Sequence, residues 1–507
     1  MTLAPPPSFS RRAAVVMAAM AIGAFVIGTR HGTWVAGGAD SYGYISQSRL
    51  WLEGRALTPQ PLPFRPPWPR AAWSLSPFGY RPAADGRGIV PTYPPGLPLA
   101  MAIFAAAGGP SAVYLVVPLF GALAVWMSGR LGQRLGGAPV ALGSAALLAA
   151  SPTFIYQLLQ PMSDVPAAAC WLAALAWAFG GGRRAHVAAG VAAAAAILIR
   201  PNLAPLAAIV IMAATWNHES PNFRWRDGLV VAVPAALAAL AIAYLQDRYY
   251  GSPLMSGYGP ASYVYNVSRV SPNLPHYLGW LAETHTPLIL LGFAWPLLAW
   301  RLPARYRAAT SACWTMSVLV LGLYLPYLEF DHWSYTRFLL LAIALLWLVL
   351  GSALAVNSGV RRFVLPPLVL AIVLFELYAG WSKEVWLARD SEQRYPGVGR
   401  IVGFFTPPNA AILTLQHSGP IRLYADRVTI RWDMIPPRWL DRSIAYLQTN
   451  QRPPFLAIED AERRAFIERF GQASKYGRLD WPPMLCRYGT CLFDPGARFD
   501  ITPRTAR

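Results

Sequence analysis

The sequence predicts an all-α polytopic membrane protein that ends in a small α/β domain. Of its 507 residues, 55% are hydrophobic and 13% are charged, and that charged fraction is about half of what soluble globular proteins carry. Long apolar runs recur over residues 13–381, and arginines cluster in every second connection between them. This alternation is the positive-inside pattern of proteins with several membrane-spanning helices.

About eleven apolar runs are predicted to cross the membrane, although several are shorter than the roughly 20 residues of an upright span. They lie at about 13–29, 111–129, 138–158, 164–181, 185–200, 203–216, 227–246, 286–300, 310–327, 335–356 and 362–381. The pair at 185–200 and 203–216 is the weakest, because Pro201 interrupts it. The segment 96–107 is apolar but short, so we expect a re-entrant or interfacial helix there.

The arginine pattern also predicts the orientation of the chain. Arg11 and Arg12 precede the first apolar run, so we expect an uncleaved signal anchor with a cytoplasmic N-terminus. With eleven spans, the outer side holds loop 30–110, loop 247–285, the turn 328–334 and everything after about 382. We therefore expect a multi-pass protein of the bacterial inner (cell) membrane whose C-terminal domain is periplasmic.

Two domains are expected, a transmembrane domain over 1–381 and an α/β domain over 382–507. In the second, AAILTLQ and PFLAI are typical of strands, and EDAERRAFIERF is typical of an amphipathic helix with Ala, Phe and Ile on one side. Cys486 and Cys491 stand close together in CRYGTC, and we expect a disulfide between them if this domain faces an oxidising compartment. No His stands at zinc-like spacing from them, so no metal site is expected.

The first outer loop carries a carboxylate close to the first apolar run. Gly37 to Arg55 reads GGADSYGYISQSRLWLEGR, which predicts an interfacial helix near 40–53 with Trp51 at the headgroup level. Asp40 begins this helix. It either caps the helix by accepting a backbone N–H bond or serves as a functional carboxylate near the membrane surface, and both interpretations stay open on these residues alone.

Further charged residues are expected on the same side of the membrane. Asp164 lies at the outer mouth between the third and fourth spans, as a helix N-cap or a second functional carboxylate. Arg200 ends the fifth span, and Arg337 lies one turn inside the tenth. A charge within a span costs about 2.5–3.5 kcal/mol on insertion scales, so it usually faces a cavity and has a partner.

The two arginines allow two interpretations. They either snorkel or pair with carboxylates, such as Glu329 or Asp331 for Arg337, or they form a cationic cradle for an anionic group such as a lipid phosphate. Tyrosines on this side could stack on sugar rings or bind hydroxyls, although tyrosine is common at membrane interfaces. The candidate substrate-binding residues are Tyr42, Tyr44, Tyr93, Tyr258 and His332.

The net charge of +19 does not indicate a nucleic-acid partner. Nearly all of the positive charge is arginine, beside abundant Ala, Pro and Gly, which is typical of a GC-rich genome. The positions of the arginines along the chain therefore carry more information than their number.

An ordered set of segments resembles the GT-C superfamily of integral-membrane glycosyltransferases. The resemblance is strongest to bacterial relatives of the protein O-mannosyltransferases and of the lipid A aminoarabinose transferase. It covers roughly residues 10–380 and depends on the order of the set rather than on any single motif. The segments are ADSYGYISQSRLWLEGR, YPPGLPLAMAIF, SPTFIYQLLQPMSDVPAAA, AGVAAAAAILIRPNLAPL, DRYYGSPLMSGYG and HWSYTRFLL.

The resemblance implies an inverting transfer of a sugar from a polyprenyl-phosphate donor to a lipid, glycan or protein acceptor at the outer membrane face. By position, Asp40 would be the general base on the acceptor hydroxyl, and Arg337 and Arg200 would balance the leaving phosphate. The protein mannosyltransferases carry Asp-Glu in this loop, whereas Ser41 follows Asp40 here. This difference leaves open the acceptor class and whether Asp164 supplies a second carboxylate. No cofactor is expected.

Two other functions are compatible with these residues. A transporter or flippase of a lipid-linked anion could use Arg200 and Arg337, although the sequence lacks the inverted repeat common in transporters. A non-catalytic assembly partner could use the C-terminal domain for docking.

Overall fold

The structure is a computed structural model that describes residues 11–59, 62, 66–216, 223–297, 299–301 and 304–498. The chain forms two compact units, each built from separated segments. Unit 1 comprises Met1–Trp34, Pro94–Asp247 and Ser252–Arg389. Unit 2 comprises Val35–Tyr93, Arg248–Gly251 and Asp390–Arg507.

Unit 1 is helical, and five of its helical segments are long and apolar enough to cross a membrane. Each overlaps one of the predicted spans, so these five predictions are confirmed as apolar helices. The α-helices in these segments are α1 (Arg11–Arg30), α5 (Val116–Gly136), α11 (Trp225–Tyr250), α15 (Leu340–Leu354) and α16 (Leu365–Ser382). Adjacent 3₁₀ or π turns lengthen three of the segments, to Pro110–Gly136, Trp333–Leu354 and Val360–Ser382.

The remaining predicted spans are shorter or broken helices. The run at 138–158 is a pair, α6 (Ala138–Ala150) and α7 (Pro152–Leu158), bent by 61°, since Pro152 cannot continue the preceding helix. The run at 286–300 contains a 3₁₀ helix, η4 (Pro287–Leu297). The other predicted runs contain α8 (Asp164–Ala178), α9 (Arg183–Ile199), η2 (Pro201–Leu206) with α10 (Ala207–Thr215), and α14 (Ala304–Tyr324). The number of spans stays a prediction.

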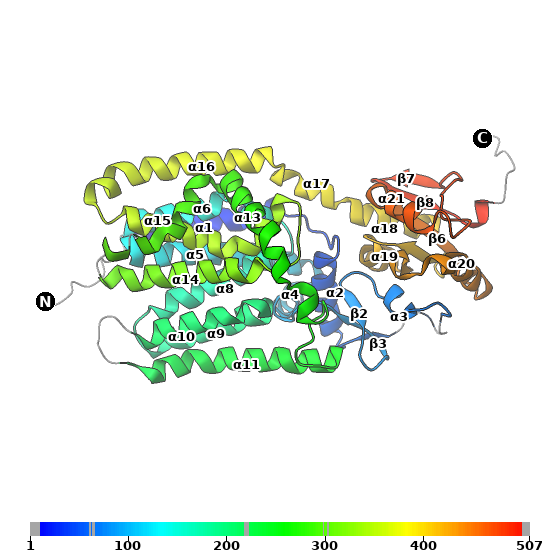
Figure 1. Ribbon diagram of the computed structural model, residues 1–507, viewed down its shortest axis with the longest axis horizontal. Coiled ribbons are helices and arrows are strands. Elements are labelled where there is room, and N and C mark those ends of the chain that lie inside the picture. Colours follow the sequence, from blue (N-terminus) through cyan, green and yellow to red (C-terminus); the bar gives the residue numbers. More distant parts are fainter. Residues whose placement is uncertain are drawn as a thin grey trace. The chain divides into compact units, whose positions relative to one another are not determined.

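Helix α5 (Val116–Gly136) contacts α1, α6 and α8 in the centre of unit 1 (Figure 1). Small residues allow these helices to approach closely: a Cβ on Gly129 would lie 2.3 Å from Cε of Met17. All residues of α8 except Trp177 are buried, as expected for a helix that is apolar on every side. The short segment at 96–107 forms α4 (Gly96–Gly108).

Unit 2 contains a five-stranded sheet in the order β5-β4-β6-β8-β7. Strand β4 (Ala411–Thr414) pairs in parallel with β5 (Val428–Arg431) and β6 (Pro454–Glu459), whereas β8 (Thr490–Phe493) runs antiparallel to β6 and β7 (Leu485–Arg487). Side chains that alternate along β4 and β6 fill two separate apolar clusters, one on each face. The flanking helices are α18 (Arg394–Phe405), α19 (Ser418–Ala425), α20 (Leu440–Thr449) and α21 (Asp460–Phe470).

The two predicted strands are confirmed as β4 and β6, and the predicted amphipathic helix is confirmed as α21. The predicted buried face of that helix is partly wrong. Glu462, Phe466 and Phe470 are buried, whereas Ala461 and Ala465 are exposed. The large aromatic rings gain more from burial than the alanine methyl groups do.

The predicted first outer loop has its residues 35–93 in unit 2, together with the C-terminal segment. It contributes α2 (Asp40–Leu52), α3 (Ala71–Ser74) and a small antiparallel sheet of β1 (Thr58–Pro59), β3 (Gly88–Pro91) and β2 (Tyr80–Pro82). Leu62, Trp68 and Leu75 from this loop join the same core as β4 and β6. Unit 2 thus takes in residues 35–93, whereas the sequence predicted a boundary at 381/382. The sequence did not indicate this grouping, because the apolar side chains concerned lie scattered in a proline-rich stretch that shows no periodicity.

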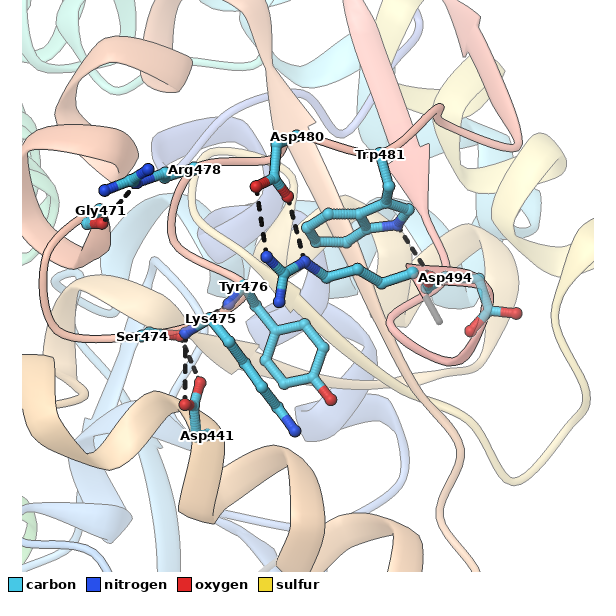
Figure 2. Close-up of polar contacts among 10 residues, drawn as sticks. Asp441, Gly471, Ser474, Lys475, Tyr476, Arg478, Asp480, Trp481 and Asp494 are labelled. Carbon is cyan, nitrogen blue, oxygen red and sulfur yellow. Dashed lines mark hydrogen bonds and ion pairs between the residues drawn. The ribbon is translucent and has the colours of Figure 1, made fainter. Parts of the chain in front are cut away.

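Polar contacts hold the segment that follows α21, including a bond from Ser474 to Asp441 of α20 (Figure 2). Asp480 accepts a hydrogen bond from Nε of Arg498 at 3.0 Å. Nε1 of Trp481 donates to the carbonyl of Asp494 at 2.9 Å (Figure 2). Cys486 and Cys491 face each other on β7 and β8, and their sulfur atoms lie 2.01 Å apart.

Candidate functional site

Asp40 is the first residue of α2, and its carboxylate is held by a tyrosine. The N-cap of α2 is Ala39, so the structure does not support the capping interpretation of Asp40. Gly38 has a φ of +55°, a conformation that favours glycine. Oδ1 of Asp40 accepts a hydrogen bond from the hydroxyl of Tyr93 at 2.6 Å, which restricts the orientation of the carboxylate.

Tyr93 is itself fixed in place by packing. It is buried, and its ring lies 4.8 Å from that of Tyr44, one turn along α2 from Asp40. Gly43 makes this approach possible, since a Cβ at that position would lie 2.2 Å from Cε2 of Tyr93. The sequence therefore places a glycine where the ring crosses the helix. Of the predicted substrate-binding tyrosines, Tyr93 bonds to Asp40 and Tyr44 packs on Tyr93.

The loop that precedes Asp40 packs against two side chains that the sequence did not indicate. A Cβ on Gly37 would lie 1.9 Å from Oε2 of Glu392 and 2.7 Å from the ring of Tyr395. Burial raises the pKa of Glu392 to about 7, against the lowering effect of Arg394. The Gly-Gly pair before Asp40 was the only sequence signal of this close approach.

In unit 1, Asp164 and Arg200 form an ion pair. Nη2 of Arg200 lies 2.6 Å from Oδ1 of Asp164, whose side chain is fully buried. Nε of Arg200 donates to Oγ of Ser163 at 3.1 Å, and Nη1 donates to the hydroxyl of Tyr324 at 2.9 Å. Asp164 is the first residue of α8, and the N-cap of that helix is Ser163. The N-cap interpretation of Asp164 is therefore not supported either.

Arg200 and Arg337 lie against the same aromatic ring. Their Cζ atoms are 5.5 Å and 5.1 Å, respectively, from the centre of the Phe338 ring. Tyr324 stacks on Phe338 at 4.8 Å, and Nδ2 of Asn202 donates to the Tyr324 hydroxyl at 2.8 Å. The two predicted phosphate-binding arginines therefore share one aromatic surface. Tyr324 and Asn202 were not predicted from the sequence, although Asn202 stands two residues after Arg200.

The structure does not bring the other candidates to these groups. Tyr42 lies on a different side of α2, where its ring is 5.9 Å from that of Tyr80. Tyr258 is 44% exposed in a turn of unit 1. His332 caps the 3₁₀ helix η6 (Trp333–Leu339), where Nδ1 accepts from the backbone N–H of Ser334 at 3.3 Å. Only His332 among these three is held by a helix cap.

Within the described ranges, no group of three or more His, Cys, Asp or Glu side chains is placed to hold a metal ion. Asp40 belongs to unit 2, and Asp164 belongs to unit 1. Unit 2 therefore holds a carboxylate fixed by a tyrosine, and unit 1 holds two arginines on one aromatic surface.

The sequence has no match among known family models or among curated proteins. Its fold, however, is similar to solved structures. ArnT from Cupriavidus metallidurans, bound to undecaprenyl phosphate, superposes with a TM-score of 0.54 at 13% identity, covering 94% of this chain and 97% of that one. The archaeal oligosaccharyltransferase AglB from Archaeoglobus fulgidus, in complex with an inhibitory peptide and a dolichol-phosphate, gives 0.55 at 11% identity, covering 90% and 71%.

A third similar structure is the arabinofuranosyltransferase AftD from Mycobacteria, with a TM-score of 0.50 at 15% identity over 91% of this chain and 36% of that one. All three proteins are GT-C glycosyltransferases. Because these likenesses extend over at least nine-tenths of the chain, they bear out the GT-C fold that the ordered segments predicted.

Proposed function

We propose, from the premise that the chain has the GT-C fold, that it transfers a sugar from a polyprenyl-phosphate donor to a lipid, glycan or protein acceptor. The observation that carries the proposal is the Asp40 carboxylate, held by Tyr93 at 2.6 Å in the first outer loop. The fold neighbours support the donor class, since ArnT holds undecaprenyl phosphate and AglB holds a dolichol-phosphate. The reaction is proposed to occur at the periplasmic face of the bacterial inner membrane.

In this proposal, Asp40 is the general base. Its carboxylate takes the proton of the acceptor nucleophile, a hydroxyl in the simplest case, and the acceptor oxygen attacks the anomeric carbon of the sugar. The bond between that carbon and the phosphate oxygen breaks, the polyprenyl phosphate leaves, and the anomeric configuration is inverted. Tyr93 orients the carboxylate, and a positioned base of this kind contributes roughly 10²–10⁴-fold to the rate.

The leaving phosphate requires positive charge, and we propose that Arg337 and Arg200 supply it. Asp164 then serves as a positioning residue for Arg200 rather than as a second base, because its carboxylate is buried in an ion pair with that arginine. A carboxylate engaged in this way is unavailable for accepting the proton of an incoming substrate.

The experiment that tests the proposal is a transfer assay on the purified chain in lipid. A panel of labelled polyprenyl-phosphate sugars is offered with a membrane extract as the acceptor source. Wild type is expected to move the label, and Asp40→Asn is expected to lose roughly 10²–10⁴-fold of that rate while keeping the wild-type unfolding temperature. Asp85→Asn is the matched control, since Asp85 pairs with Arg87 on an exposed turn of unit 2.

Full transfer by Asp40→Asn would reject Asp40 as the base. Donor binding with no transfer by wild type, together with donor flux across sealed vesicles, would favour a transporter of a lipid-linked anion instead.

A further inference from the structure

Unit 2 contains a pocket of about 290 Å³ along a side of α2 that does not carry Asp40. Successive helix residues are turned by about 100°, so Tyr42 and Arg49 lie roughly opposite Asp40, whereas Tyr44 lies near it. The volume is close to the lower limit of small-ligand pockets, roughly 300 Å³. The lining residues that carry the argument are Tyr42, Ser46, Arg49, Tyr80, Arg422 and Arg427.

Positive charge dominates this pocket. Its lining holds Arg49, Arg55, Arg422 and Arg427 against two carboxylates, Glu53 and Asp426. Arg55 pairs with Glu53. The ion pairs found within the described part of the chain include none of the other three arginines.

The hydrogen-bond partners of the Arg422 guanidinium are neutral oxygen atoms. Its Nε donates to Oγ1 of Thr429 at 2.7 Å, and its Nη2 donates to the carbonyls of Thr429 and Leu75 at 2.9 Å and 2.5 Å. Burial lowers its pKa, while the neighbouring Tyr42 acts in the opposite direction. Arg422 is half-buried, and withdrawing a cation from water without a counter-charge carries a cost, so an anion in the pocket would offset part of it.

Arg427 lines the same pocket. Its guanidinium donates to the carbonyls of Ala425, Gly403 and Thr406 at 2.8 Å, 3.0 Å and 2.9 Å. These bonds fix the position of a second cation with neutral partners. Arg49, by contrast, is exposed on α2, so its side chain is available to close on a ligand.

Aromatic and hydroxyl groups provide the rest of the wall. Tyr42 and Tyr80 are each 6% exposed, and their rings lie 5.9 Å apart. The Tyr80 hydroxyl donates to Oγ of Ser46 at 3.0 Å. Ring faces beside fixed hydroxyl groups suit a sugar ring, which presents both C–H and O–H groups, and arginine forks suit a phosphate or carboxylate.

We propose that this pocket binds a saccharide that carries a phosphate or a carboxylate, and that this saccharide is part of the acceptor. The acceptor would then be anchored by a charged group distinct from the hydroxyl that Asp40 deprotonates. The assignment to the acceptor rests on the proposed function, whereas the binding of an anionic sugar does not.

The test measures binding to the full chain in lipid nanodiscs by saturation-transfer NMR and calorimetry. The probes are glucose 6-phosphate, glucuronate, uncharged glucose and inorganic phosphate. Both anionic sugars are expected to bind, and glucose is expected to bind at least tenfold more weakly. Arg49→Gln should weaken the binding of the anionic sugars by roughly tenfold, which is the effect of losing one charge-assisted hydrogen bond. Arg400→Gln, which removes an exposed arginine outside the pocket, should change nothing.

Equal binding of glucose 6-phosphate by wild type and Arg49→Gln, or no binding by either, would overturn the proposal. Inorganic phosphate binding as tightly as glucose 6-phosphate would overturn the saccharide part. Asp40→Asn is expected to bind the anionic sugars as wild type does, so a failure of transfer is separable from a failure of this pocket. Once an acceptor is known, an unchanged acceptor KM in Arg49→Gln would reject the assignment to the acceptor.

Discussion

Tyr93 donates a hydrogen bond to Asp40 and packs its ring against Tyr44, and these two interactions can be separated by mutation. Tyr93→Phe removes the 2.6 Å bond to Oδ1 of Asp40 but keeps the ring against Tyr44. A carboxylate that loses one charge-assisted bond is less well oriented, and such bonds are worth about 1.5–3 kcal/mol. We expect kcat to fall roughly tenfold to a hundredfold with little change in KM.

The measurement is steady-state transfer by Tyr93→Phe and wild type, with the unfolding temperature of each recorded alongside. Tyr93→Leu, which also loses the ring contact, should lower both the rate and the unfolding temperature. A wild-type kcat in Tyr93→Phe would show that the tyrosine does not orient Asp40.

Glu392 gives unit 2 a dependence on pH near neutrality. Burial raises its pKa from 4.5 to about 7, with Arg394 lowering it and Glu459 raising it. Between these two values the folded state holds a proton that the unfolded state has released, so the free energy of unfolding falls as the pH rises from about 4.5 to about 7. A glutamine at position 392 stays neutral at every pH, so the fall in the free energy of unfolding that Glu392 causes should be absent in Glu392→Gln.

Thermal unfolding of Glu392→Gln and wild type at pH 5 and pH 8 measures this effect. The variant should gain stability relative to wild type on going from pH 5 to pH 8. Glu468→Gln, at an exposed pair with Arg464, controls for the removal of a carboxylate. Curves for Glu392→Gln and wild type that run parallel across this range would contradict the prediction.

The sequence indicated which residues could carry chemistry, but it did not show how they pair. Asp40 and Tyr93 are separated by 53 residues, and Asp164 and Arg200 by 36. No local pattern predicts contacts at such separations. Tyr42 and Tyr44 illustrate the same limit within a single helix, because a difference of two positions turns one toward Asp40 and the other away from it.

At the scale of elements, the contact between α2 and the segment after β3 depends on one glycine. Gly43 lies under the ring of Tyr93, and a Cβ there would lie 2.2 Å from Cε2 and 2.4 Å from Cδ2 of that ring. A ring held by packing cannot retreat without breaking its bond to Asp40. We therefore expect Gly43→Ala to lose transfer to the same extent as Tyr93→Phe or more.

The matched control is Gly279→Ala, also at a helical glycine, where an added Cβ meets no atom within 4 Å. It should keep the wild-type rate. Because the alanine at position 43 favours the helix itself, circular dichroism should show no loss of helix in either variant. Wild-type transfer by Gly43→Ala would mean that Tyr93 is not required in this position.

Element types were predicted best where one physical signal dominates. The five helical segments that are long and apolar enough to cross a membrane, and the strands β4 and β6, follow from hydrophobicity and periodicity alone. The bend between α6 and α7 and the 3₁₀ geometry of η4 depend on prolines and packing around them, which hydrophobicity does not report. Residues 35–93 show little hydrophobic periodicity, so their membership of unit 2 was not predicted.

At the scale of the whole molecule, the order of the segments was sufficient to predict the GT-C fold, because that order reflects the sequence of helices and loops along the chain. The composition of unit 2 could not be predicted in the same way. Its core is assembled from the first outer loop and the C-terminal segment, which are separated by almost the entire set of helices of unit 1. A composite core of this kind appears only when distant side chains are brought together.

This composite core predicts that the first outer loop cannot keep its structure without the C-terminal segment. Trp68 and Leu75 are each 2% exposed and pack with Leu440 and Trp432. A chain that ends at Arg389 would expose these apolar side chains to water, at a cost of roughly 1.5–3 kcal/mol for each large one. We expect residues 35–93 of the truncated chain to become sensitive to proteolysis and transfer to be lost, although the helices of unit 1 remain folded.

Limited proteolysis with mass spectrometry, on both chains in nanodiscs, locates the cleavage sites. Trp68→Ala in the full chain tests the same core from the loop side and should destabilise unit 2 by about 3–5 kcal/mol. New cleavage sites within 35–93 of the truncated chain would support the composite core. Protection of 35–93 in the truncated chain, with transfer retained, would instead show that the loop folds without the C-terminal segment. In either outcome the truncated chain is expected to lose the anionic-sugar pocket, because Arg422 and Arg427 belong to the part removed.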